Sequence, residues 1–178
     1  MVEVTNKSQR NWTAKDCALI GVMVTLLIVA QVTLSALSGV ELVTVLLASF
    51  AYCFGVRRGV LTALLFSLLR QFIFGVFPNV LCLYLVYFSF LALVFGLLGH
   101  RGGYRRGILV LVASLCTVCF TLLDNVLTPF WYGYSMEAAK VYFYASFTTL
   151  VPHVICVAVT VGILFAPLCR LFASARRD

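Results

Sequence analysis

The stretch GVLTALLFSLLRQFIFGVFPN, at residues 59–79, decides how the rest of the chain is interpreted. It is apolar enough to lie in a lipid bilayer, yet Arg70 and Gln71 stand in its second half. A guanidinium group inside hydrocarbon costs several kcal/mol unless it is paired or hydrated. Arg70 therefore needs a partner from another segment or a water-filled cavity, and we expect the other segments to form the bundle that supplies it.

The composition of the whole chain points to a membrane protein. Of its 178 residues, 63% are hydrophobic and 11% are charged, whereas a soluble domain is about half apolar and a quarter charged. The chain is therefore expected to be a single integral membrane domain in contact with the lipid bilayer. Its net charge of +7 would suggest nucleic acid in a soluble protein. Here the basic residues lie between apolar segments, where they act as topology signals, so no nucleic-acid partner is expected.

Six apolar runs predict six membrane-spanning helices, because a span takes about 20 residues. The fold class expected is an all-α membrane protein, a six-transmembrane-helix bundle. The expected helices cover residues 17–37, 41–56, 59–75, 80–98, 108–130 and 141–168.

The distribution of Lys and Arg predicts the orientation of this bundle. If the N-terminus is cytoplasmic and the chain crosses six times, eleven basic residues lie inside and only Lys140 lies outside, with Arg70 in the membrane. Cytoplasmic loops carry such an excess, so both termini are expected to be cytoplasmic. The inside residues are Lys7, Arg10, Lys15, Arg57, Arg58, Arg101, Arg105, Arg106, Arg170, Arg176 and Arg177.

Polar residues of the membrane segments then collect in the outer half of the bilayer, on several helices. These candidate substrate-binding residues are Gln31, Glu41, Arg70, Gln71, Asn79, Tyr84, Tyr87, Asp124 and Asn125, with His153 near the middle of the last helix. Ionisable residues inside a membrane mark functional sites by default. The pattern predicts a polar pocket toward the outer face, because small-molecule sites combine apolar walls with a few polar groups. The aromatic residues expected to supply the walls are Phe72, Phe74, Phe77, Tyr84, Tyr87, Trp131, Tyr132 and Tyr134. For the last three, an interfacial belt or loop packing is an equal alternative.

Other interpretations of the same residues stay open at this point. Arg70 could form an ion pair with Asp124 or Glu41 that only holds helices together. Asp124 and His153 would suit an intramembrane enzyme if they lay within hydrogen-bond reach. No second histidine lies near His153, so no metal is expected, and the sequence indicates no cofactor.

Small residues follow one side of the first expected helix at its cytoplasmic end. Ala14 and Ala18 are four residues apart, and Gly21 follows Cys17 at the same spacing. Faces of this kind let membrane helices approach closely. They indicate either packing within the bundle or a docking surface for another membrane subunit.

Three stretches give the chain a resemblance to the substrate-binding S components of energy-coupling factor (ECF) transporters. GVELVTVLLASFAYCFGVRRG resembles the second helix of that family, and LLRQFIFGVFPN resembles the third. VPHVICVAVTVGILFAPL resembles the last helix, in which a histidine precedes a final Pro-Leu. The resemblance covers most of the chain.

The resemblance implies a subunit of the bacterial cytoplasmic membrane, and not an enzyme, that binds a vitamin or a related micronutrient at the outer face. It would deliver the ligand inward together with a transmembrane coupling protein and two ATP-binding subunits. The face at Ala14 and Ala18 would be the docking site. Arg70 would bind an anionic group of the ligand through bidentate hydrogen bonds, and Asp124 or Glu41 a donor or cationic group. The substrate itself, and whether the coupling module is dedicated or shared, stay open.

Two other functions compete with transport. A structural scaffold of the rod-shape, MreD-like kind has a similar length but does not need Arg70 or the outer polar residues. An intramembrane enzyme is the third alternative, and it would require the pairing of Asp124 with His153.

Overall fold

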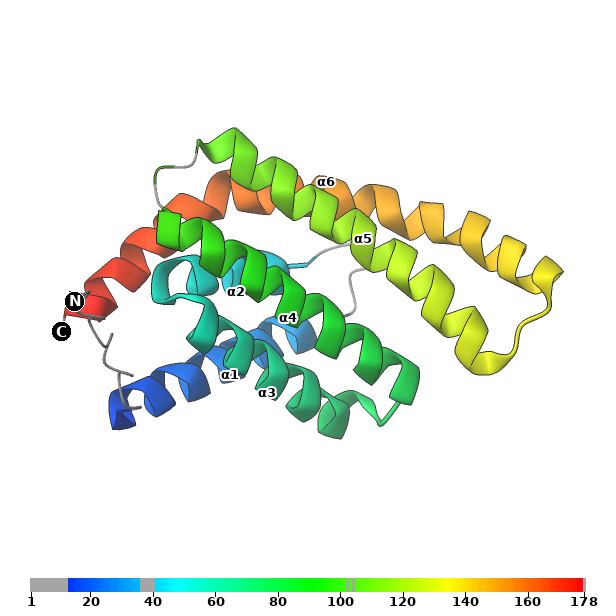
Figure 1. Ribbon diagram of the computed structural model, residues 1–178, viewed down its shortest axis with the longest axis horizontal. Helices are drawn as coiled ribbons and strands as arrows, with labels where there is room; N and C mark the ends of the chain where they lie inside the picture. The colour runs from blue at the N-terminus through cyan, green and yellow to red at the C-terminus, as the bar shows by residue number, and fades with distance from the viewer. Residues whose placement is uncertain (1–12, 36–40, 102, 104, 178) are drawn as a thin grey trace, which may run out of the picture.

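The computed structural model describes residues 13–35, 41–101, 103 and 105–177, and these residues form α-helices and no strands (Figure 1). In chain order the helices are α1 (Ala14–Leu34), α2 (Val43–Phe54), α3 (Val56–Phe74), α4 (Pro78–Arg101), α5 (Arg106–Tyr132) and α6 (Met136–Arg177). The expected all-helical class is confirmed. Both ends of the described chain lie at the same end of the molecule.

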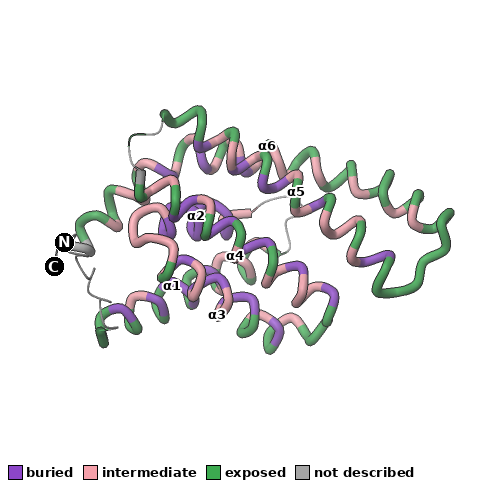
Figure 2. The backbone as a smooth tube through the Cα atoms, in the orientation of Figure 1, coloured by how far each residue is buried: buried purple, intermediate pink, exposed green. Residues whose placement is uncertain are grey.

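The short helix α2 forms the centre of the packing. Every residue from Val43 to Ala51 is buried, and α2 packs against α1, α3, α4 and α6. Figure 2 shows it as a continuous buried segment surrounded by the longer helices. Because apolar side chains cover α2 on all sides, this helix is a core element that does not need to be amphipathic.

Glycine lets α4 approach the end of α2 very closely. A Cβ atom at Gly99 would lie 2.0 Å from the carbonyl oxygen of Tyr52. The turn from α2 to α3 consists of Gly55 alone, whose φ of 88° favours glycine. These two positions hold α2, α3 and α4 in a tight cluster.

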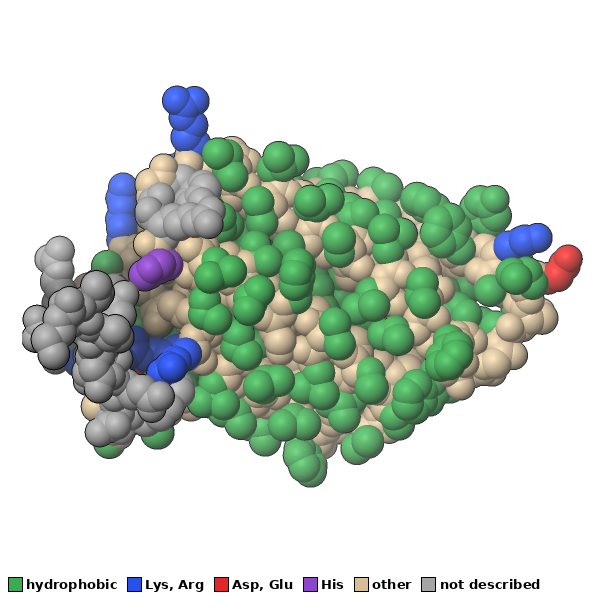
Figure 3. Space-filling model, in the orientation of Figure 1, with side chains coloured by type: hydrophobic (Ala, Val, Ile, Leu, Met, Phe, Trp, Pro, Cys, Tyr) green, Lys and Arg blue, Asp and Glu red, His purple; other side chains and the backbone are tan. Residues whose placement is uncertain are grey.

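The hairpin of α5 and α6 extends beyond the other helices at the end away from the termini (Figure 1). Gly133 closes α5 in a left-handed conformation. The helix α6 then runs for 42 residues, through Pro152 and Pro167, back to the other end. Hydrophobic side chains cover the length of the molecule, and most Lys and Arg side chains visible in Figure 3 lie at the end that holds the termini.

Four of the described helices, α1, α4, α5 and α6, are long and apolar enough to cross a membrane. The helix α2 has only 12 residues, which span about 18 Å, less than the ~30 Å hydrocarbon thickness. The helix α3 carries Arg57, Arg58 and Arg70 among its 19 residues. The sequence predicts six membrane crossings. Among the described helices, four have the length and hydropathy that a full membrane span requires.

Some helices begin earlier than the hydrophobic pattern predicts. The helix α1 begins at Ala14 rather than at residue 17, because Thr13 and Asp16 form a capping box. The helix α3 begins at Val56 and includes Arg58, whose guanidinium group forms an ion pair with Asp16 at 2.7 Å. This pair joins α1 to α3 at the end of the molecule that holds the termini.

Candidate functional site

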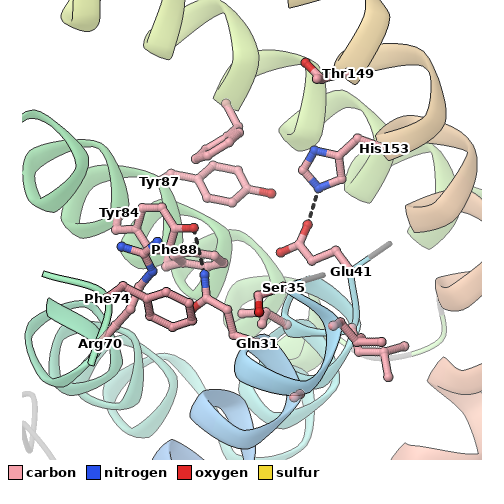
Figure 4. Close-up of a pocket in the computed structure, with 15 residues that line it drawn as sticks. Gln31, Ser35, Glu41, Arg70, Phe74, Tyr84, Tyr87, Phe88, Thr149 and His153 are labelled. Carbon is pink, nitrogen blue, oxygen red and sulfur yellow. Dashed lines mark hydrogen bonds and ion pairs between the residues drawn. The ribbon is translucent and has the colours of Figure 1, made fainter. Parts of the chain in front are cut away.

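A cavity of about 310 Å³ lies between the helices, and Figure 4 shows its walls. Side chains of α1, α3, α4, α5 and α6, and of the segment that enters α2, line it. Its lining residues are Ala30, Gln31, Leu34, Ser35, Glu41, Leu42, Val43, Arg70, Phe74, Tyr84, Tyr87, Phe88, Phe120, Thr149 and His153.

Arg70 forms one side of this cavity, against aromatic rings. Its guanidinium carbon lies 4.2 Å from the ring centroid of Tyr84 and 4.8 Å from that of Phe74. Phe74 follows Arg70 by one turn of α3, so the helix itself places the ring beside the cation. Such cation–π contacts partly compensate a buried guanidinium group. The Nε and Nη1 atoms of Arg70 are buried and have no hydrogen-bond partner among the described residues.

Two neighbouring side chains also have unused hydrogen-bonding capacity. Gln31 Nε2 donates a hydrogen bond of 2.9 Å to the hydroxyl of Tyr84. The Oε1 atom of Gln31 and the hydroxyl of Tyr87 are buried and lack a partner in the part of the chain that the structure describes. An unsatisfied buried polar group costs about 1–3 kcal/mol. This part of the cavity therefore holds polar atoms that a ligand could satisfy with hydrogen bonds.

Glu41 and His153 form the opposite side of the cavity. The carboxylate Oε2 of Glu41 meets the imidazole Nε2 of His153 in a short contact, and Oε1 accepts a hydrogen bond of 3.0 Å from Thr44. The backbone N–H of Glu41 donates to Cys156 Sγ, one turn after His153 on α6. These contacts attach the start of α2 to α6. Both side chains of the pair stay about one-fifth exposed, at 20% for Glu41 and 21% for His153.

The cavity is therefore polarised. Figure 4 shows the Arg70 guanidinium group on one side and the Glu41–His153 pair on the other, with Tyr84, Tyr87 and Phe88 between them. No ion pair joins Arg70 to Glu41 or Asp124, since Glu41 engages His153 and Asp124 engages two hydroxyl groups. Arg70 therefore does not form the structural ion pair with Asp124 or Glu41 that was the alternative interpretation of the sequence.

Six of the ten predicted polar residues line the cavity: Gln31, Glu41, Arg70, Tyr84, Tyr87 and His153. The other four, Gln71, Asn79, Asp124 and Asn125, do not line it. Depth in the bilayer places nine of the ten in the outer half and His153 near the middle, but it does not specify which way each helix face points. The four outlying residues all make hydrogen bonds elsewhere.

Asp124 and Asn79 belong to a separate network between α4, α5 and α6. Asp124 accepts hydrogen bonds of 2.6 Å from Tyr142 and 2.7 Å from Thr128. Asn79 donates to Thr128 at 3.3 Å and accepts from Tyr132 at 3.3 Å. One hydrogen-bond network thus joins α4, α5 and α6 through five residues: Asn79, Asp124, Thr128, Tyr132 and Tyr142. Both carboxylate oxygens of Asp124 are satisfied within it.

Gln71 and Asn125 each make one hydrogen bond outside the cavity, and their other polar atoms, Gln71 Nε2 and Asn125 Oδ1, are buried without a partner among the described residues. Gln71 is only 4% exposed, and its Oε1 accepts the backbone N–H of Phe77 just after α3 ends. Asn125 donates a hydrogen bond of 2.9 Å to Ser146 and so joins α5 to α6. No hydrogen bond joins Asp124 to His153, so the contact that the enzyme alternative requires is not formed.

Several lining residues were not predicted from the sequence. Ser35, Phe88 and Thr149 each lie one helical turn from a predicted residue, namely Gln31, Tyr84 and His153. Positions four residues apart share a helix face, so this spacing could have identified these three residues from the sequence. Phe120 on α5 has no such neighbour among the residues lining the cavity.

The small residues of α1 lie away from the cavity. Ala14, Ala18 and Gly21 are exposed, and a Cβ atom added at Gly21 meets no atom within 4 Å. The opposite face of α1 carries the buried residues, among them Met23 and Leu27. Within the described ranges, no group of three or more His, Cys, Asp or Glu side chains is placed to hold a metal ion.

Comparison with protein families decides the class of the chain. A model of the family described as ECF-type riboflavin transporter, S component, matches residues 11–173. The chain belongs to this family. Comparisons with curated proteins and with solved structures gave no significant match.

As an S component, the chain belongs to a family of transporter subunits and not of enzymes. S components bind small molecules and work with an ECF module that contains ATPases. The resemblance seen in the sequence is confirmed, and the apolar helices agree with a multi-pass membrane protein.

Proposed function

We propose that this chain is the substrate-binding subunit of an ECF importer for riboflavin or a closely related flavin vitamin. It captures the vitamin at the outer face of the bacterial cytoplasmic membrane. It then delivers the vitamin inward with a transmembrane coupling protein and two ATP-binding subunits. The family name supplies the ligand class, and the cavity between Arg70 and Glu41 is the observation that carries the proposal.

The size and chemistry of this cavity fit a flavin. Its volume of about 310 Å³ is at the lower end of the range for small-molecule sites, which combine apolar walls with a few placed polar groups. Riboflavin has a flat tricyclic ring with a carbonyl edge and a polyol tail. The rings of Phe74, Tyr84, Phe88 and Phe120 supply aromatic surface, and Arg70, Gln31, Glu41 and His153 supply polar groups.

Arg70 supplies donors for the carbonyl edge of the ring. Two of its nitrogen atoms, Nε and Nη1, have no hydrogen-bond partner among the described residues, so a ligand that accepts hydrogen bonds removes an existing cost. The anionic ligand group expected from the sequence is not needed for this role. A charged donor forms stronger hydrogen bonds than a neutral one even with a neutral carbonyl.

The arrangement of charge supports a cytoplasmic location for both termini. The ion pair of Arg58 with Asp16, the exposed Arg105 and Arg106, and both ends of the described chain lie at one end of the molecule. Lys140 lies near the start of α6, at the other end. With the basic end inside, Arg70 lies in the outer half of the membrane.

Native mass spectrometry of the gently purified protein tests this function. We expect a bound small molecule with the mass of riboflavin or a related flavin. Arg70→Ala should lose it, because the variant removes the donors while the helices stay packed. Arg170→Ala is the matched control, since Arg170 is exposed on α6 and does not line the cavity.

The proposal is contradicted if the protein carries no flavin and gains none when riboflavin is added in excess. It is also contradicted if Arg70→Ala retains the flavin with the same affinity as the Arg170→Ala control.

A further inference from the structure

We infer that Glu41 makes the site select the unphosphorylated vitamin, because it places a carboxylate where the polyol tail of the ligand binds. This inference rests on the proposed function and specifies how the ligand lies in the cavity. The ring binds on the Arg70 side, and the tail lies against Glu41 and His153.

The two sides of the cavity have opposite character, and this sets the orientation. Phe74 and Tyr84 flank the guanidinium group of Arg70 within 4.8 Å, so the aromatic surface and the charged donors lie together. The carbonyl edge of a flavin accepts hydrogen bonds and matches that side. In the reverse orientation this electron-rich edge would face the carboxylate of Glu41, with no donor of comparable charge to stabilise it.

Glu41 retains the capacity to accept hydrogen bonds from hydroxyl groups. Its Oε1 takes one hydrogen bond from Thr44, and its Oε2 takes the contact with His153. A carboxylate offers about four lone-pair sites, so each oxygen can accept one more donor. The Glu41 side chain is 20% exposed, and Thr149 lines the same side of the cavity, as Figure 4 shows. The Thr149 hydroxyl donates to the backbone carbonyl of Ser146 at 2.9 Å and can still accept a hydrogen bond. The hydroxyls of a polyol tail match this set.

A phosphate at the end of that tail is disfavoured on this side. A phosphate monoester carries about −1.5 to −2 charges at neutral pH, and juxtaposed like charges cost several kcal/mol. Among the described residues that line the cavity, Arg70 is the only Lys or Arg, and it lies on the opposite side. His153 is the other basic group there, and Glu41 already engages it.

The test is a fluorescence-quenching titration of the full-length protein in lipid nanodiscs with riboflavin and with riboflavin 5′-phosphate. The wild type should bind the phosphate ester at least about tenfold more weakly than riboflavin. Glu41→Gln keeps hydrogen-bonding groups for Thr44 and His153 but removes the charge. It should lower the discrimination to about threefold or less. Glu137→Gln removes the same charge from an exposed position outside the cavity and should leave the discrimination unchanged.

A second variant adds a charge on the tail side instead of removing one. Thr149→Lys places a cation on the cavity wall, one turn of α6 before His153, and should improve binding of the phosphate ester relative to riboflavin by about tenfold. This variant keeps the inference testable if Glu41→Gln does not fold, and thermal melting in the nanodisc verifies that each variant is folded.

The possible outcomes separate the inference from the proposed function. If no flavin binds the wild type, both are wrong. If riboflavin binds but Glu41→Gln and Thr149→Lys leave the ratio of affinities unchanged, the inference alone is wrong. If the wild type prefers the phosphate ester and Arg70→Ala removes that preference, the ligand lies in the reverse orientation and the inference is overturned.

Discussion

Arg70 and Asp124 are ionisable residues in the membrane region, but their surroundings differ. Both oxygens of Asp124 accept hydroxyl hydrogen bonds, at 2.6 Å and 2.7 Å. Two nitrogens of Arg70, Nε and Nη1, have no hydrogen-bond partner among the described residues, and the rings of Phe74 and Tyr84 lie against its guanidinium group. A satisfied carboxylate stabilises the packing of helices, whereas an unsatisfied donor beside a cavity is available to a ligand. We therefore propose a structural role for Asp124 and a ligand-binding role for Arg70.

Asp124→Ala should destabilise the protein without weakening ligand binding. The change leaves the hydroxyls of Tyr142 and Thr128 without their acceptor, at a cost of about 1–3 kcal/mol. The melting temperature should fall by several degrees, while riboflavin affinity stays within about threefold of the wild type. Thermal melting and flavin titration of the same nanodisc sample measure both quantities.

Glu137→Ala, at an exposed position early in α6, is the control for loss of an acidic side chain. A fall of riboflavin affinity by tenfold or more in Asp124→Ala, at temperatures where the variant is folded, would show that Asp124 belongs to the binding site after all.

The sequence alone does not distinguish these two residues. Depth in the bilayer places Arg70 and Asp124 near each other, but the direction of a side chain depends on the rotation of each helix. That rotation is fixed by tertiary contacts, such as the packing of α3 against α4 and of α5 against α6. Glu41 and His153 are far apart in the sequence, and their pairing likewise depends on how α2 packs against α6.

At the scale of elements, α1 has two distinct faces. One face is buried in the bundle through Ile20, Met23 and Leu27. The other carries Ala14, Ala18 and Gly21 in exposed positions. Because small residues let membrane helices approach closely, we propose this face as the docking surface for the coupling protein. The docking surface and the cavity then lie on different parts of the molecule.

Replacing Ala14 and Ala18 together by leucine should block assembly and preserve ligand binding. The larger side chains prevent close approach on the exposed face, so recovery of the coupling protein with the tagged variant should fall at least about tenfold. Riboflavin affinity of the isolated subunit should not change. Co-purification from cells that express all subunits measures the first quantity, and titration measures the second.

Ala145→Leu provides the matched control, because Ala145 is exposed on α6 and lies outside the proposed docking surface. Normal assembly of the Ala14/Ala18 variant would instead indicate that this face of α1 contacts only lipid.

The positions of the elements follow from the apolar runs, but their ends do not. Capping by Thr13 starts α1 early, and the basic pair Arg57–Arg58, expected between two helices, lies inside α3. The 12 residues of α2 are fewer than the apolar run around them, because Gly55 ends the helix. Capping side chains and a single glycine act locally, and a hydrophobicity pattern does not resolve them.

At the scale of the whole molecule, the distribution of basic residues indicates which end of the bundle faces outward. Basic residues gather at the end that holds the termini, and hydrophobic side chains cover the length of the bundle (Figure 3). The positive-inside rule then directs the opposite end outward. In the function that we propose, this orientation lets the cavity receive the vitamin outside the cell, while the exposed face of α1 docks to the coupling protein within the membrane.

Uptake of radiolabelled riboflavin tests the central claim most directly. The cells should lack their own flavin uptake and express this chain with a coupling protein and two ATPases of the ECF type. The account predicts accumulation that requires all subunits, is lost when ATP is depleted, and falls to background in Arg70→Ala but not in Arg170→Ala. Assembled complexes that accumulate no riboflavin, or that accumulate it equally well with Arg70→Ala, would contradict the account.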